Sequence, residues 1–273
     1  MRTLVHLSDL HFGRVDHAII KPLIQAINDV KPDVVAVSGD LTQRARVREF
    51  KAARAFLDAL PLRQIVVPGN HDIPLHNILF RFVRPLDKYR RYITHDLQPF
   101  SADDEIAVFG VNTARSLTIK GGRINEEQVA WLREKLCALG PEVIKIVVTH
   151  HPFDVPEGYE KRDLVGRAEM AMELLAGCGA DVFLAGHLHV SHTGDTAKRY
   201  RVGGRSALVV QAGTAASTRG RGEANSFNVI RLAHPDIIIE RYEWQPERAV
   251  FAGSSADQFR LESEGWSRVS SEK

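Results

Sequence analysis

Five short polar segments of the sequence contain the residue types that bind metal ions in proteins. Each follows an apolar run, and together they supply carboxylates, an amide oxygen and imidazoles. The segments are Asp9-Leu10-His11, Gly39-Asp40, Gly69-Asn70-His71-Asp72, Thr149-His150-His151 and Gly186-His187-Leu188-His189. This donor set suits manganese, iron or zinc better than calcium or magnesium, and the lack of thiolates in it argues against a structural zinc site.

The segments contain more candidate ligands than one ion can use. The candidates are Asp9, His11, Asp40, Asn70, His150, His187 and His189. If one carboxylate is shared, these side chains provide four ligands to each of two ions. Two ions about 3.5–4 Å apart can bind and deprotonate a shared water while they hold phosphoryl oxygens for in-line displacement. The pattern therefore predicts hydrolysis of a phosphoester.

The elements that must position these residues can be read from the apolar periodicity. The predicted strands are residues 3–7, 33–38, 64–67, 105–112, 143–148 and 182–185, and the predicted helices are residues 18–30, 47–60, 125–138 and 164–176. Alternation of strand and helix favours βαβ units with parallel pairing. Functional loops in such sheets lie beyond the carboxyl ends of the strands, so we expect the five segments to meet at one edge.

The C-terminal part of the chain has a different pattern. Residues 205–211, 226–232 and 236–243 read as strands without helices between them, which is typical of antiparallel pairing. Residues 246–273 are polar and predicted to be irregular, although Phe251, Phe259 and Trp266 indicate that they pack against something. We therefore expect one domain over residues 1–245 and an extension over residues 246–273, which packs on the domain or on a partner subunit.

The composition is that of an ordinary globular protein. The chain has 273 residues and a net charge of +2. That charge gives no strong signal for nucleic acid or membrane. No apolar run approaches the ~20 residues that a membrane span needs. The chain starts directly in a strand, without the features of a secretory signal, so we expect a cytoplasmic protein. Cys137 and Cys178 fall in helical stretches and are predicted to be reduced, buried spacers.

Motif for motif, the five segments resemble the calcineurin-like metallophosphoesterases, over roughly residues 3–232. The resemblance implies a four-layer α/β/β/α sandwich of two mixed sheets, with a dinuclear metal site at the carboxyl edge of the strands. Within the family, three features are similar to the class III cyclic-nucleotide phosphodiesterases. They are the Gly-Asn-His-Asp segment, the compact length and Gly213-Thr214-Ala215.

The resemblance also implies a role for each residue. One metal would be held by Asp9, His11, Asp40 and His189, and the second by Asp40, Asn70, His150 and His187, with Asp40 bridging. His71 would contact the phosphate or protonate the leaving oxygen. Asp72 would orient the His71 ring, as a carboxylate commonly does for a catalytic or metal-binding histidine. Asn70 and His71 are also expected to contact the substrate. From their positions in the sequence rather than from the resemblance, His151 is a further candidate, either facing the substrate or lying behind the ligands, and Arg44 and Arg219 are candidate cations that attract an anionic substrate.

The leading hypothesis is a phosphoesterase that cleaves a small phosphodiester, such as a cyclic nucleotide, by attack of a metal-bridging hydroxide. Its cofactors would be two metal ions per chain, with manganese or iron expected before zinc. A homodimer is a further prediction. A DNA-repair nuclease, a pyrophosphate hydrolase of nucleotide-sugar lipids and a non-catalytic scaffold are the alternatives. The lipid alternative needs an apolar or basic helix that docks on the membrane. The nearest match in the sequence is short: Phe80, Phe82 and Val83 among the cations Arg81, Arg84 and Lys88.

Overall fold

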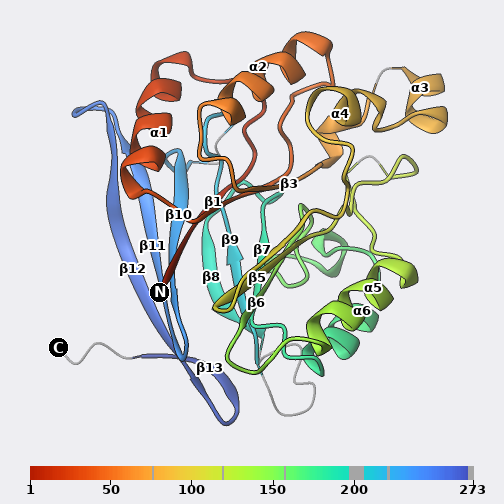
Figure 1. Ribbon diagram of the computed structural model, residues 1–273. Helices are drawn as coiled ribbons and strands as arrows, with labels where there is room; N and C mark the ends of the chain where they lie inside the picture. The colour runs from red at the N-terminus through yellow and green to blue at the C-terminus, as the bar shows by residue number, and fades with distance from the viewer. Residues whose placement is uncertain (76, 119, 157, 197–205, 220–221, 270–273) are drawn as a thin grey trace.

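The computed structural model describes residues 1–75, 77–118, 120–156, 158–196, 206–219 and 222–269 (Figure 1). Its first sheet has the strand order β13-β12-β11-β10-β1-β2-β3. The strands are β1 Arg2–Leu7, β2 Val34–Ser38, β3 Gln64–Val67, β10 Ser226–Ala233, β11 Asp236–Gln245, β12 Val250–Glu262 and β13 Gly265–Arg268. Strands β1, β2 and β3 are parallel, and the strands from β10 onward are antiparallel. Both pairing modes were predicted.

The second sheet has the strand order β4-β5-β6-β7-β9-β8. Its strands are β4 Phe100–Ala102, β5 Ile106–Gly110, β6 Ile144–Val148, β7 Val182–Ala185, β8 His192–Asp195 and β9 Leu208–Gln211. The four central strands are parallel, and β4 and β8 add antiparallel edges. The two edge strands were not predicted, because β4 has only three residues and β8 has four that are mostly polar.

The helices are α1 His17–Val30, α2 Val47–Asp58, α3 Ile78–Val83, α4 Asp87–Tyr92, α5 Glu126–Cys137 and α6 Ala168–Ala176, with 3-10 turns at Asn70–Asp72 and Lys161–Asp163. Figure 1 shows α1 and α2 outside the first sheet and α5 and α6 outside the second, with the two sheets between them. The molecule is therefore the predicted four-layer α/β/β/α sandwich of two mixed sheets.

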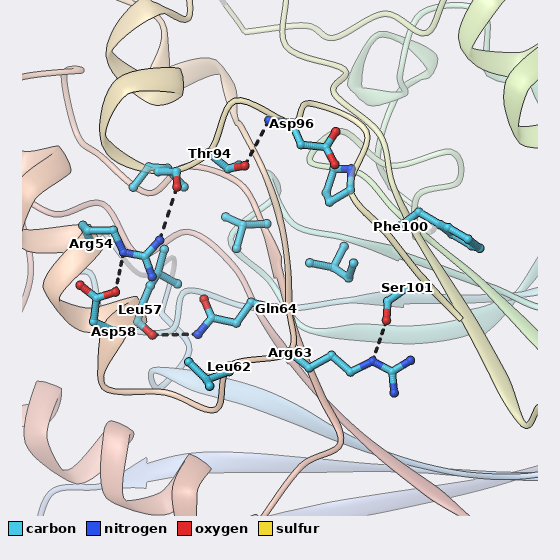
Figure 2. A pocket seen from close by; sticks show the side chains of 14 residues that line it. Arg54, Leu57, Asp58, Leu62, Arg63, Gln64, Thr94, Asp96, Phe100 and Ser101 are labelled. Carbon is cyan, nitrogen blue, oxygen red and sulfur yellow. Dashed lines mark hydrogen bonds and ion pairs between the residues drawn. The ribbon is translucent and has the colours of Figure 1, made fainter. Parts of the chain in front are cut away.

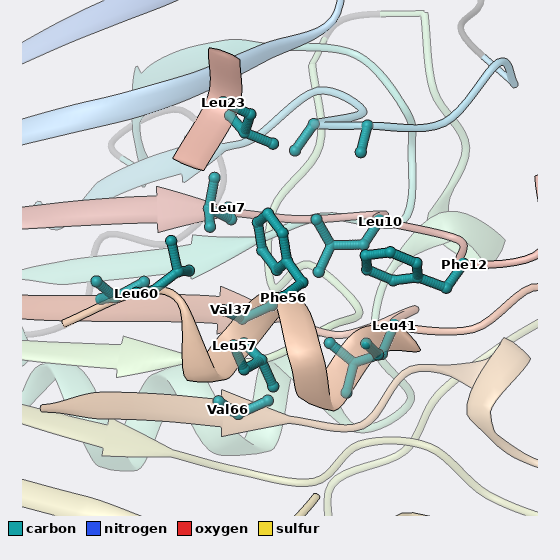
Figure 3. Packing of buried hydrophobic residues seen from close by; sticks show 14 of the residues in the cluster. Leu7, Leu10, Phe12, Leu23, Val37, Leu41, Phe56, Leu57, Leu60 and Val66 are labelled. Atoms are coloured by element: carbon teal, nitrogen blue, oxygen red, sulfur yellow. The ribbon is translucent and has the colours of Figure 1, made fainter. Parts of the chain in front are cut away.

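Alternation along the strands explains why both faces of each sheet are buried. In β1, Leu4 points into the core between the sheets, whereas Val5 and Leu7 point toward the helices. Figure 3 shows the helix-side core, where Leu7 packs with Leu23 of α1 and Phe56 of α2. Parallel strands that are covered on both faces need side chains that are apolar along their whole length, as in the run of residues 34–37.

Most of residues 246–269 form regular strands, although the sequence predicted an irregular segment there. Strands β12 and β13 extend the first sheet, and β12 pairs with β11 along most of its length. Phe259 and Trp266 are buried in the core between the sheets, and Phe251 is buried on the helix side. The prediction was wrong because most other side chains of β12 face solvent, so its composition resembles that of a polar loop.

The prediction for the cysteines was also wrong. Cys137 at the end of α5 and Cys178 just after α6 form a disulfide, with their Cα atoms 4.7 Å apart. The two residues are 41 positions apart in the sequence, and only the packing of α5 on α6 brings them together. The cysteines therefore give no support to a reducing compartment. Among the helices in the described ranges, none combines the length and the apolar character that crossing a membrane would need.

Candidate metal centre

The carboxyl ends of five parallel strands meet at one edge of the sandwich and bring all seven candidate ligands together. The first sheet supplies Asp9 and His11 after β1, Asp40 after β2 and Asn70 after β3, and the second sheet supplies His150 after β6 and His187 and His189 after β7. The carboxylates and the amide thus come from one sheet, and most of the imidazoles come from the other. The site exists only where the two sheets face each other.

One group of potential ligand atoms comprises Asp9, His11, Asp40 and His189, which lie within 4.8 Å of one another. The Oδ1 atom of Asp9 is 3.4 Å from Nε2 of His189 and 3.5 Å from Nε2 of His11. The two imidazole Nε2 atoms are 3.4 Å apart. The Asp9 Oδ1 atom is buried and has no hydrogen-bond partner. A buried carboxylate oxygen in this position is costly unless a cation satisfies it.

The second group lies on the other side of Asp40. The Nδ1 atom of His150 donates to the Ser38 carbonyl at 2.8 Å, so its Nε2 atom faces the site. That Nε2 atom is 3.1 Å from Oδ1 of Asn70 and 3.4 Å from Oδ1 of Asp40. The other Asp40 oxygen is 3.7 Å from Nε2 of His11. Asp40 therefore lies between the two groups, where a bridging carboxylate would have to be.

The electrostatics of the cluster require positive charge. Burial raises the pKa of Asp40, but His150 and His11 outweigh this and hold it well below its usual value. Burial lowers the pKa of His150, but Asp40, Asp9 and the Ser38 carbonyl raise it to about 9. The opposite shifts of these carboxylates and imidazoles favour a cation shared between them, either a proton or a metal ion. The carboxylate, amide and imidazole donors, without thiolates, fit a transition-metal ion.

The backbone of the cluster is strained. Positive φ angles occur at Asp9 (52°), His11 (48°), Asp40 (52°), His187 (72°) and His189 (60°). Non-glycine residues rarely adopt this region, and such strain persists only where the surrounding structure enforces it. Five of the seven candidate ligands thus adopt a costly conformation, and the chain turns sharply at the strand ends to direct their side chains into the site.

Two glycines allow the loops to approach each other. A Cβ atom at Gly186 would lie 1.7 Å from Oγ of Ser8, and one at Gly69 would lie 2.1 Å from Oδ1 of Asp40. Neither position has room for a side chain. In the space so left, Oδ2 of Asp9 accepts from the Ser8 hydroxyl at 2.7 Å and from the backbone N–H of His187 at 3.0 Å. These bonds fix the Asp9 carboxylate and leave Oδ1 directed at the cluster.

His71 lies beside the cluster without joining it. Its backbone N–H donates to Oδ1 of Asp40 at 2.8 Å, and its ring Nδ1 donates to the Gln43 carbonyl at 2.8 Å. The ring Nε2 accepts from the Arg219 guanidinium at 3.0 Å. Burial is the main cause that lowers the pKa of His71, and the Arg219 charge adds to it. A histidine and an arginine are therefore paired next to Asp40.

A cavity of about 490 Å³ opens above these groups. Asp40, Asn70, His71, His187 and His189 lie in its lining, together with three cations, Lys120, Arg162 and Arg219. The lining also contains the acidic Asp163, and Arg162 lies 3.2 Å from Glu160, so cations outnumber the acid in the wall apart from the candidate ligands. A phosphate group that enters this cavity meets the candidate ligands and these cations. The arrangement is suited to bind and activate a small phosphoester.

A match to a protein family identifies the kind of protein that has this site. Residues 2–191, more than half of the chain, match the family described as calcineurin-like phosphoesterases. The chain belongs to this family. Membership of the calcineurin-like phosphoesterases supports a dinuclear metal site, in agreement with the two groups of side chains that could hold an ion, one of Asp9, His11, Asp40 and His189 and the other of His150, His151 and His187.

Individual relatives of this calcineurin-like chain are more distant. A glycerophosphodiester phosphodiesterase GpdQ of Enterobacter lignolyticus is 26% identical over 184 residues, which are 63% of this chain and 64% of that protein. A probable cyclic nucleotide phosphodiesterase of Rhodococcus erythropolis is 26% identical over 216 residues, which are 70% of this chain and 65% of that protein. The chain thus matches slightly less than two thirds of the length of these curated relatives.

A solved structure shows the same fold. The crystal structure of a dimetal phosphatase from Danio rerio superimposes on this chain with a TM-score of 0.66 and 14% sequence identity. The superposition covers 92% of this chain and 98% of the phosphatase chain. At this identity, the likeness concerns the fold alone.

Asp72 does not have the position that the sequence predicted. Its carboxylate accepts from the backbone N–H groups of Leu41 (3.2 Å), Thr42 (2.9 Å) and Gly69 (2.9 Å), and from the Thr42 hydroxyl (2.9 Å). It therefore joins the Asp40 loop to the Asn70 loop, and the Gln43 carbonyl rather than Asp72 orients the His71 ring. The prediction that Asp72 pairs with the ring was wrong, because backbone donors nearby in space cannot be seen in the sequence.

His151 and Arg44 are not placed as substrate contacts either. The Nδ1 atom of His151 lies 2.8 Å from the Thr113 hydroxyl, and its Nε2 atom lies 3.0 Å from the Lys120 carbonyl. His151 is near His150 and His187, but both its nitrogens already have partners. The Arg44 side chain is exposed and absent from the described cavity lining, where Lys120 and Arg162 supply the charge instead. Sequence reasoning missed both, because they lie in polar loops that no motif marks.

Another hollow, of about 520 Å³, lies at the amino end of β3 (Figure 2). Its cations are engaged with neighbours. Arg54 donates to Asp58 at 2.8 Å, and Arg63 donates to Ser101 at 2.6 Å and to Asp103 at 3.0 Å. These arginines serve the structure, so the cavity at the carboxyl edge is the candidate site.

Proposed function

We propose that the protein is a metal-dependent phosphodiesterase that hydrolyses a small, anionic phosphodiester. The observation that carries the proposal is the position of Asp40, with one oxygen 3.7 Å from Nε2 of His11 and the other 3.4 Å from Nε2 of His150, the atom that also lies 3.1 Å from Oδ1 of Asn70. One metal would be held by Asp9, His11, Asp40 and His189, and the other by Asp40, Asn70, His150 and His187. When bound, the two ions would supply an activated water and neutralise charge on the phosphate.

The remaining groups would act on the substrate directly. His71 presents Nε2 to the cavity, and Arg219 donates to that atom at 3.0 Å. A bound phosphate oxygen can replace this contact, and its negative charge opposes the burial and the Arg219 charge that lower the pKa of His71. The imidazole can then take up a proton at Nε2 and donate to the phosphate together with the guanidinium. His71 would then stabilise charge on the leaving oxygen or protonate it. The bond from His71 Nδ1 to the Gln43 carbonyl would keep the ring aimed at the phosphate.

The cavity also supports a class of substrate. Its walls contain the cations Lys120, Arg162 and Arg219, and among the described lining residues there is no phenylalanine, tyrosine or tryptophan on which a base could stack. We therefore favour diesters with a small polar alcohol, such as glycerophosphodiesters, over cyclic nucleotides. The names of the relatives include both activities. We expect the metal ions to be manganese or iron, with zinc as the third choice. The cytoplasmic location and the homodimer remain predictions.

A substrate and metal panel tests the proposal. The purified chain is stripped of metal and reloaded with manganese, iron, zinc or magnesium. Glycerophosphocholine, bis(nitrophenyl) phosphate, cyclic AMP, nitrophenyl phosphate and single-stranded DNA are then assayed, and bound metal is measured by elemental analysis. We expect two ions per chain and the fastest turnover on a small diester with manganese or iron. Preference for DNA would indicate a nuclease, and metal binding without turnover of any substrate would indicate a scaffold.

A further inference from the structure

Helix α3 and its surroundings expose an unusual amount of apolar surface. We call the side chains of Leu75, Ile78, Leu79, Phe80, Phe82, Val83 and Leu117 the α3 surface; each is between 43% and 86% exposed. They are half of the large hydrophobic side chains that are exposed in the described part of the chain. Apolar side chains gathered in this way on a protein surface mark an interaction site.

The exposure is built into the structure and does not come from a frayed end. Arg81 is buried, and its guanidinium donates to the carbonyls of Ser116 (2.8 Å) and Pro74 (3.3 Å), and also to that of Thr118. These bonds hold the helix against the segment that contains Leu117. At its start, the Asn77 side chain accepts from the Phe80 N–H at 3.1 Å. The α3 surface is therefore presented by an anchored helix, which Figure 1 shows at the margin of the molecule.

The distribution of exposed residues around α3 indicates what covers it. Successive residues of a helix are turned by about 100°, so the exposed side chains of Ile78 to Phe80, Phe82 and Val83 spread over about 200° of the helix circumference, wider than the apolar stripe of an ordinary amphipathic helix. Only Arg81 points into the protein. A groove on a partner protein covers one stripe of a helix, whereas the apolar part of a bilayer surrounds an inserted helix on all exposed sides.

The charges beside α3 select the kind of bilayer. Arg84, Arg90 and Arg91 follow in the chain and are exposed, and Lys88 donates to the Ala45 carbonyl. The single acidic residue in this stretch, Asp87, lies 3.7 Å from Arg84. Exposed arginines that follow an exposed apolar helix in the chain are a combination typical of segments that bind an interface with anionic lipids.

We propose that the α3 surface docks the protein on an anionic membrane, with Phe80 and Phe82 among the inserted side chains and the arginines on the headgroups. The loop that carries Leu117 continues to Lys120 in the cavity wall. The docked protein would thus hold its cavity close to the lipid surface. The docking itself does not depend on the proposed phosphodiesterase activity.

Cosedimentation with vesicles tests the proposal. The full chain is mixed with vesicles of phosphatidylcholine alone, or of an equal mixture of phosphatidylcholine and phosphatidylglycerol, at low and high salt. We expect binding to the mixed vesicles that weakens with salt. The double variant Phe80→Ser/Phe82→Ser should lose about tenfold or more in vesicle affinity, since it loses two inserted aromatic rings. Ile78→Ser/Leu79→Ser should show a similar loss.

The matched control is Leu62→Ser, because Leu62 is 97% exposed but lies outside the α3 surface. It should sediment like the wild type, and circular dichroism should show that all variants are folded. Failure of the wild type to bind mixed vesicles would overturn the proposal, as would equal binding by the double variants. A dimer in solution that the double variants lose would show that the α3 surface is an interface between copies instead.

Discussion

Two buried aspartates at the same edge of the first sheet have opposite environments. The Asp40 carboxylate faces imidazoles from both sheets, and although burial raises its pKa, these imidazoles hold it well below the usual value. The Asp72 carboxylate faces backbone N–H groups and a hydroxyl, and burial together with the nearby Asp40 charge raises its pKa to about 6. Both side chains are almost fully buried. Burial alone therefore does not separate a functional carboxylate from a structural one.

The difference lies in the chemistry of the partners. Imidazole nitrogens are metal ligands themselves, so a carboxylate surrounded by them lies where a cation can be shared. Backbone N–H groups can only donate, so a carboxylate that accepts from several of them is already satisfied. Asp40 and Asp72 should consequently fail in different ways when they are replaced.

The largest effect is expected for Asp40→Ala. Asp40 lies between both groups of ligand atoms, so its loss should weaken both metal sites. We expect most of the bound metal and nearly all of the activity to be lost, as measured by elemental analysis and by turnover of bis(nitrophenyl) phosphate. Removing a charge from a crowded buried cluster should leave the metal-free fold intact.

The control for Asp40→Ala is Asp29→Ala, which removes an exposed aspartate on α1. It should keep the wild-type metal content. Two tightly bound ions per Asp40→Ala chain would refute the shared position of Asp40.

The next effect is expected for His71→Ala. His71 contacts Asp40 through its backbone only, so the variant should keep its metal. Loss of an acid–base group typically slows turnover by about 10²–10⁴. The loss should be greater for poor leaving groups than for nitrophenolate, which needs no proton. His192→Ala, away from the cluster, should be normal. An equal loss for all leaving groups would assign His71 to phosphate binding alone.

The sequence could predict most of the metal centre because its geometry follows from parallel sheets. Residues that directly follow buried strands must meet at one edge, and this placed Asp9, Asp40 and His150 together. The four layers followed from strand and helix alternation for the same reason. Positive φ at five of the candidate ligands could not be predicted from residue type, since aspartate and histidine adopt it more often than most residues but still only in a small minority of positions.

The remaining features depend on neighbours that are distant in the sequence. Asp72 binds amides of a loop about 30 residues earlier, and Cys137 pairs with Cys178 across two packed helices. Strand β12 has too few buried side chains to show an alternating pattern. The α3 segment has apolar residues typical of a core, so its exposure could be seen only in the structure.

The smallest effect on chemistry, and the sharpest test of the comparison, is expected for Asp72→Ala. Four donors lose their acceptor, three of them backbone N–H groups at Leu41, Thr42 and Gly69. An unsatisfied buried donor costs about 1–3 kcal/mol, but relaxation and the removal of a buried charge whose pKa is raised both offset part of the sum, so the free energy of unfolding should fall by about 1–3 kcal/mol. Chemical denaturation of the metal-free protein measures this loss.

Asp72→Asn should lose less stability, because its amide keeps one acceptor oxygen in the same space. With saturating metal, both Asp72 variants should retain turnover that His71→Ala lacks, since the Gln43 carbonyl still orients the His71 ring. If Asp72→Ala is as stable as the wild type but turns over as slowly as His71→Ala, Asp72 acts on the His71 ring after all. In that case the two aspartates do not differ in the way that their partners indicate.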